Sequence, residues 1–130
     1  MSKGNTFEND LMKLIFQGTA IADLADNDAT SPLTSLYVSL HTGDPGEAGN
    51  QTTSEIAYTG YARQAVARSA AGWTVTNNSV SPVANIDFPE MTGGAGGTVT
   101  HWAVGTVVSG AGKILYSGTV TPNSFSTASA

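Results

Sequence analysis

The chain has 130 residues and a formal net charge of −5, and only 12% of its residues are charged. Its five basic residues do not cluster, and the balance of charge is acidic, so we expect no binding to nucleic acid or to anionic membranes. The absence of cysteine excludes disulfides and thiolate zinc sites. No apolar run approaches the ~20 residues of a membrane span or resembles a secretory signal, so we expect one domain, residues 1–130, made in a cytoplasm.

The first segment is predicted to form a helix that begins near Asn5 and ends near Gly18. Apolar residues recur there at helical spacing and line one face: Phe7, Leu11, Leu14 and Ile15. We expect the face of Phe7, Leu11 and Ile15 to lie in the core or on a dimer surface. A shorter helical turn is predicted over residues 21–25.

From residue 33 onward the apolar pattern changes to a period of two, which is typical of strands. Strands are predicted at residues 35–41, 61–68, 73–76, 98–108 and 113–120, with weaker signals between residues 80 and 88. Glycines, one proline and polar residues make 42–53 a loop. One helix followed by six or seven short strands predicts a mainly β, antiparallel β-sandwich. Residues 1–9 and 121–130 are possible extended arms.

Histidine is the commonest acid–base group, and His41 ends a predicted strand beside a loop that carries Asp44 and Glu47. These residues could form a metal or acid–base cluster. The alternative is a strand-end histidine that faces solvent or bonds a loop carbonyl, which we favour because a reactive site needs several convergent groups. His101 is interpreted as a sheet-face residue. We therefore expect no catalytic residue, metal or cofactor, and no enzyme activity.

Two further patterns have structural interpretations that we favour. The segment 105–112 before Lys113 superficially resembles a phosphate-binding loop, but its lysine is misplaced and a strand follows, so a hairpin turn is predicted. Four aromatic residues could form a sugar-binding platform, although aromatic residues in strands more often lie in cores or interfaces: Tyr58, Tyr61, Trp73 and Trp102.

Several runs of the sequence carry a family resemblance. They are residues 3–10, the distinctive run from Leu36 to Thr52, Glu55, residues 58–63 and 66–68, and residues 110–118. Together they resemble a family of small virion proteins of tailed phages, whose members are often called tail fibre proteins. They are also similar to capsid cement, or decoration, proteins of short-tailed phages. The resemblance covers nearly the whole chain.

The cement resemblance implies a jelly-roll-like domain, paired as homodimers, that binds the outer surface of the major capsid protein shell and stabilises it. We expect the protein in the virion, after assembly in the host cytoplasm. The alternatives are a tail or tail-fibre component involved in host attachment, and a sugar-binding module or enzyme. The expected protein contacts lie on the helix, in the polar loop and in the C-terminal arm: Phe7, Leu11, Ile15, Asp44, Pro45, Glu47, Asn50 and Phe125.

Overall fold

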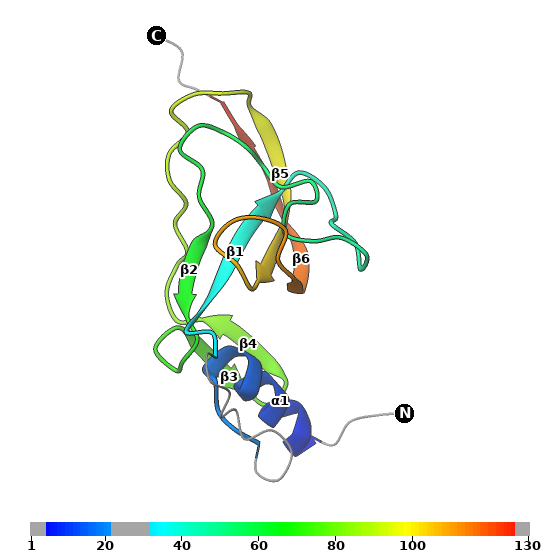
Figure 1. Ribbon diagram of the computed structural model, residues 1–130, viewed down its shortest axis with the longest axis vertical. Helices are drawn as coiled ribbons and strands as arrows, with labels where there is room; N and C mark the ends of the chain where they lie inside the picture. Colours follow the sequence, from blue (N-terminus) through cyan, green and yellow to red (C-terminus); the bar gives the residue numbers. More distant parts are fainter. Residues whose placement is uncertain (1–4, 22–31, 127–130) are drawn as a thin grey trace. The chain divides into compact units, whose positions relative to one another are not determined.

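The computed structural model describes residues 5–21 and 32–126 of the chain (Figure 1). These ranges hold one helix and six strands: α1 (Asn5–Gln17), β1 (Ser35–His41), β2 (Gln64–Ala67), β3 (Trp73–Thr76), β4 (Ser79–Pro82), β5 (Gly97–Gly105) and β6 (Ile114–Phe125). The predicted class, mainly β with antiparallel sheets and one N-terminal helix, is confirmed. The described part contains no helix long and apolar enough to span a membrane. The helical turn expected over residues 21–25 falls almost entirely outside the described residues.

The chain divides into two compact units, and each unit is built from two separate segments. The first comprises residues 1–36 and 66–86, with α1 and the hairpin of β3 and β4. The second comprises residues 37–65 and 87–130, with most of β1, the long loop after it, β5 and β6.

In the first unit, α1 ends where the sequence predicts. Gly18 has a φ of 67°, a left-handed conformation that glycine adopts without steric cost. The amide of Thr19 then donates to the carbonyl of Lys13 at 3.1 Å, which closes the helix end. The Arg68 guanidinium donates to two more carbonyls of the last turn, including that of Ile15 at 2.8 Å. Carbonyls that a helix end leaves without partners are thereby satisfied.

The buried side chain of α1 is Phe16, which is 2% exposed and packs edge-on against Trp73, with ring centroids 4.7 Å apart. The face predicted from the sequence is not the most buried one, because Phe7 is 40% exposed and Leu11 and Ile15 are only half-buried. The helix therefore turns Phe16 into the interior, and the contact role of Phe7, Leu11 and Ile15 stays a prediction.

The hairpin of β3 and β4 also follows the sequence pattern. Thr76 pairs with Ser79 across a two-residue turn, in which Asn77 adopts a φ of 56° that asparagine tolerates better than most residues. β4 ends at Pro82, as expected for a residue that cannot donate to a strand ladder.

The second sheet has four strands in the order β2-β1-β5-β6, in which β5 pairs antiparallel with both β1 and β6. Figure 1 shows β1 in cyan beside β5 in yellow. β6 continues past the predicted end at residue 120, because Phe125 still pairs with Gly97. Both expected arms are thus partly regular structure: residues 121–125 belong to β6 and residues 5–9 to α1. Ser126 follows β6, and residues 1–4 and 127–130 lie outside the described part.

An apolar cluster forms a core within the second unit. Its buried members are Ile56, Tyr58, Met91 and Val99, and partly buried side chains pack around them: Leu40, Tyr61, Val120 and Phe125. The ring of Phe125 stacks on that of Tyr58 with centroids 5.3 Å apart. Phe125, an expected contact residue, is therefore partly buried against residues of its own chain.

Candidate interaction surface

An ion pair between the buried side chain of Arg63 and the partly buried side chain of Glu55 lies in the second unit. The Nε of Arg63 donates to Oε2 of Glu55 at 2.7 Å, and a terminal guanidinium nitrogen donates to Oε1 at 2.8 Å. Arg63 is only 7% exposed. The hydrogen bonds to Glu55 raise the pKa of the Arg63 guanidinium, which therefore stays protonated and positively charged. Tyr61 adds a third contact to Glu55, because its hydroxyl donates to Oε2 at 2.7 Å.

The same guanidinium holds the loop between β5 and β6. Its two terminal nitrogens donate to the carbonyls of Val107 at 3.0 Å and Gly110 at 2.8 Å. All hydrogen-bonding nitrogens of Arg63 are thus used, which compensates for the removal of a charge from water. Arg63 therefore joins the segment before β2 to a loop more than 40 residues later.

Gln51 is a second clamp on that loop and is fully buried. Its Oε1 accepts the amides of Thr106 at 3.0 Å and Val107 at 3.1 Å, while its Nε2 donates to the Val107 carbonyl at 3.2 Å. The backbone N–H of Gln51 donates to the carbonyl of Ala111 at 2.8 Å. The hairpin predicted at this loop is confirmed, because β5 and β6 pair antiparallel on either side of it. Gln51 holds the loop at both of its ends.

His41 is held in the same manner, within the second unit. Its Nδ1 lies 2.8 Å from the carbonyl oxygen of Thr53 and its Nε2 lies 2.8 Å from Oγ of Ser39. A carbonyl only accepts, so Nδ1 carries the proton and Nε2 accepts from the serine hydroxyl. Burial lowers the pKa of His41, against a smaller raising effect from Thr53 and Glu55. Of the two structural expectations, the bond to a loop carbonyl is confirmed and exposure to solvent is wrong.

The Ser39–His41 contact has the spacing of a nucleophile and its base, but both side chains are 0% exposed. Substrate has no access to them, and the group that orients the ring is a backbone carbonyl. We interpret the pair as a structural contact that attaches the polar loop, at Thr53, to β1. Across residues 5–21 and 32–126, no three histidine, aspartate or glutamate side chains gather so as to hold a metal ion.

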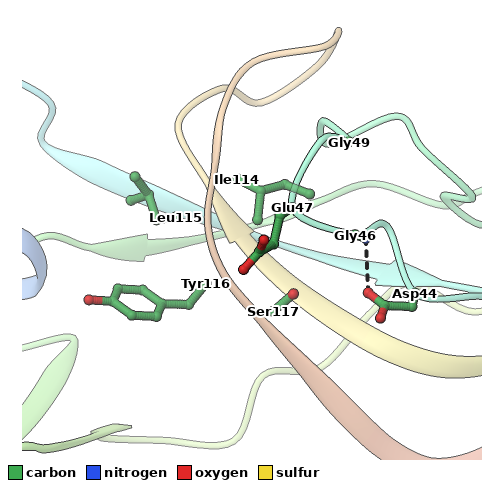
Figure 2. Close-up of a pocket in the computed structure, with 8 residues that line it drawn as sticks. All are labelled: Asp44, Gly46, Glu47, Gly49, Ile114, Leu115, Tyr116 and Ser117. Carbon is green, nitrogen blue, oxygen red and sulfur yellow. Dashed lines mark hydrogen bonds between the residues drawn. The ribbon is translucent and has the colours of Figure 1, made fainter.

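A hollow of about 450 Å³ lies between the polar loop and the start of β6 (Figure 2). Loop residues line one side of it, and consecutive residues of β6 line the other: Asp44, Gly46, Glu47, Gly49, Ile114, Leu115, Tyr116 and Ser117. Figure 2 shows Glu47, Ser117 and Asp44 together, with Leu115 and Tyr116 across the β6 segment from them. The hollow is open and acidic, and both of its carboxylate residues are exposed.

The contact residues expected in the loop fall into two groups. Asp44 and Glu47 are exposed and line the hollow, so they are available to a partner. Pro45 is buried within its own loop. Asn50 supports the loop internally, because its Oδ1 accepts the amide of Thr52 at 2.9 Å. The structure therefore brings two of these four residues to one accessible surface.

Sequence reasoning missed the residues that fix the loops: Gln51, Glu55 and Arg63. They occur in the runs that carry the family resemblance, but nothing in their local spacing indicates burial. The sequence offered one indication of their importance, which is that they are charged or amide side chains in a chain with few charges. That indication does not identify the groups they bind.

Comparison with curated proteins found no match. A family model described as Podophage GP4 fiber I protein gp80 matches residues 2–128, almost the full length of the chain. This match agrees with the resemblance to small phage virion proteins. It supports a place in the virion without distinguishing the shell from the tail. The chain belongs to this podophage family and is a structural protein of the virion.

Proposed function

We propose that the protein is a fibre subunit of the podophage particle, which acts by binding neighbouring protein subunits. The observation that carries the proposal is the match of residues 2–128 to a family whose description names a fibre protein. The buried polar groups described above support it, because each of them fixes a loop. A chain built in this way presents shaped surfaces to other subunits.

The loop contacts have a physical consequence for binding. Arg63 and Gln51 hold the loop of residues 106–112, and His41 holds the end of the polar loop at Thr53. Loops that are ordered before they meet a partner lose less conformational entropy on association. The exposed residues Asp44 and Glu47 are thereby offered in a fixed arrangement, which favours specific contact over transient adhesion.

The cement role expected from the sequence is the alternative location. It would place the chain on the shell, with the major capsid protein as partner, whereas the fibre role places it on an appendage. Both roles need contact surfaces and neither needs a reactive group. The family description favours the fibre, and the two locations differ sharply in copy number.

Quantitative mass spectrometry of purified particles separates these locations, with the major capsid protein as internal standard. An appendage built on low rotational symmetry predicts about a few dozen copies or fewer in each particle. A shell protein that repeats over an icosahedral lattice predicts copies on the order of hundreds, which would contradict the fibre proposal. Absence from the particles would contradict both locations.

A further inference from the structure

The acidic hollow between the polar loop and the start of β6 has walls that are tied to each other. The backbone N–H of Gln51 in the polar loop donates to the carbonyl of Ala111, three residues before β6, at 2.8 Å. Within the loop, the amide of Gly49 donates to the carbonyl of Gly46 at 3.3 Å, which folds the lining segment back on itself. The hollow is therefore formed before a partner arrives, and little ordering is needed on binding.

Figure 2 shows the side chains of Asp44, Glu47 and Ser117 together in this hollow, and all three residues are exposed. The carboxylate of Asp44 is fixed, because its Oδ1 accepts the N–H of Gly46 at 2.9 Å. Neither Asp44 nor Glu47 joins an ion pair with another residue of the ranges 5–21 and 32–126. The hollow thus presents two carboxylates and a hydroxyl oxygen to a ligand that supplies positive charge.

The ammonium group of a lysine matches these three acceptors. It carries one positive charge and three N–H donors, on a flexible stem of methylene groups that packs well against apolar surface. Ile114 and Leu115 give the same hollow half-buried apolar side chains. Its volume of about 450 Å³ also far exceeds the space of a single ion, since one water molecule takes about 30 Å³ of the liquid. The lining therefore favours a lysine side chain over a metal ion.

The chain itself is a poor source of that lysine. It has three lysines, Lys3, Lys13 and Lys113, and no basic residue in the polar loop. Lys113 comes directly before β6 but does not line the hollow. Two copies of a chain with a net charge of −5 also repel each other, whereas a more basic protein is attracted to this surface. Charge complementarity therefore favours a different protein as the partner.

We propose that the hollow receives a lysine side chain of a different protein of the particle, with its ammonium group beside Asp44, Glu47 and Ser117. The inference rests on the proposed role as a subunit that binds its neighbours, and it names the chemistry of one such neighbour. Hydrogen bonds between an ammonium group and carboxylates are stronger than those between neutral groups. Because both carboxylate residues are exposed, added salt should weaken the contact.

A second test compares two pairs of substitutions in phage particles that carry the altered chain. Asp44→Asn/Glu47→Gln removes both charges from the hollow, and the asparagine oxygen can still accept the N–H of Gly46. This variant should leave particles in raised salt about tenfold faster than wild type, or more. Asp87→Asn/Glu90→Gln removes two exposed charges outside the hollow and should leave at the wild-type rate. Melting temperatures of both purified variants should match that of wild type. Equal release rates for the two variants would overturn the proposal.

Carbodiimide cross-linking of intact wild-type particles identifies the partner, because the reagent joins a carboxylate directly to a lysine amine that contacts it. Mass spectrometry should find Asp44 or Glu47 linked to a lysine of a different particle protein. Asp87 and Glu90 are the control carboxylates and should not be linked to that lysine. Links from the hollow only to another copy of the chain, or none although the chain is present, would overturn the proposal. Absence of the chain from the particles would instead contradict the proposed function.

Discussion

The buried side chain of Gln51 occupies the space that a methyl group at Gly105 would fill. A Cβ built at Gly105 would lie 2.1 Å from Cδ of Gln51. The last residue of β5 is therefore a glycine because the glutamine must reach under the strand end to hold the loop of residues 106–112.

We expect Gly105→Ala to lower the free energy of unfolding by about 1–3 kcal/mol, since the added methyl displaces Gln51 from well-packed surroundings. Gly43→Ala is the matched control, because its Cβ would meet nothing nearer than 3.7 Å. The control should cost about 0.5 kcal/mol or less. Urea denaturation of both variants measures the difference, and equal losses would show that the close approach to Gln51 is unimportant.

Arg63→Met should lower the free energy of unfolding by about 2–4 kcal/mol, because it leaves the partly buried carboxylate of Glu55 without its cation. Glu55→Leu/Arg63→Met should cost less than the sum of the two single changes, since no unpaired charge remains. Denaturant titrations of the three variants give the coupling energy.

Lys113→Met removes an exposed cation and should be nearly neutral, which makes it the control for the loss of positive charge. Additive effects of the Glu55 and Arg63 changes would show that the two side chains do not stabilise the fold as a pair.

The stability of the protein should fall as the pH drops below 6.5, partly through His41. Burial lowers the pKa of His41 in the folded chain from its ordinary value of 6.5. Between the lowered pKa and 6.5 the unfolded chain binds more protons than the folded one, so protons favour unfolding. The stabilising effect is complete above pH 6.5 and is lost progressively below it.

Unfolding free energies measured at several pH values check this expectation. The variant His41→Asn should show a shallower decline on acidification than wild type. An unchanged slope in His41→Asn would mean that another group governs the acid sensitivity.

Phe16→Ala should lower the free energy of unfolding by about 3–5 kcal/mol, because the ring is buried against Trp73. Phe7→Ala removes the same group from a side chain that is 40% exposed and should cost much less. Thermal melts of both variants distinguish the interior face of α1 from the exposed one. A larger loss for Phe7→Ala would restore the face first predicted from the sequence.

Local patterns in the sequence were sufficient for most of the elements. β1 and β3 have the bounds predicted from alternation and turn residues, and α1 ends at the predicted glycine. Phe16 was missed because Phe7, Leu11 and Ile15 form a regular helical stripe that does not include it. The choice between adjacent stripes depends on Trp73, which lies far along the chain and whose contact no spacing reveals.

The site was less accessible to sequence reasoning for the same reason. Asp44 and Glu47 were expected as contacts, and the structure places both on one hollow. Gln51 and Arg63 bind carbonyls that are between 40 and 60 residues away, so their roles appear only when the chain is folded. The alternation in β1 hid the burial of Ser39 and His41, because both faces of that strand are covered.

Deletion of the coding sequence from a phage that carries it, followed by electron microscopy and adsorption assays of the particles, tests whether the protein is a fibre subunit. If it is, the particles should have filled heads of normal heat resistance but no fibre density, and they should adsorb more slowly until the gene is supplied in trans. Unchanged fibres and adsorption, combined with heads that release DNA at lower temperature, would contradict the fibre role and favour a position on the capsid shell.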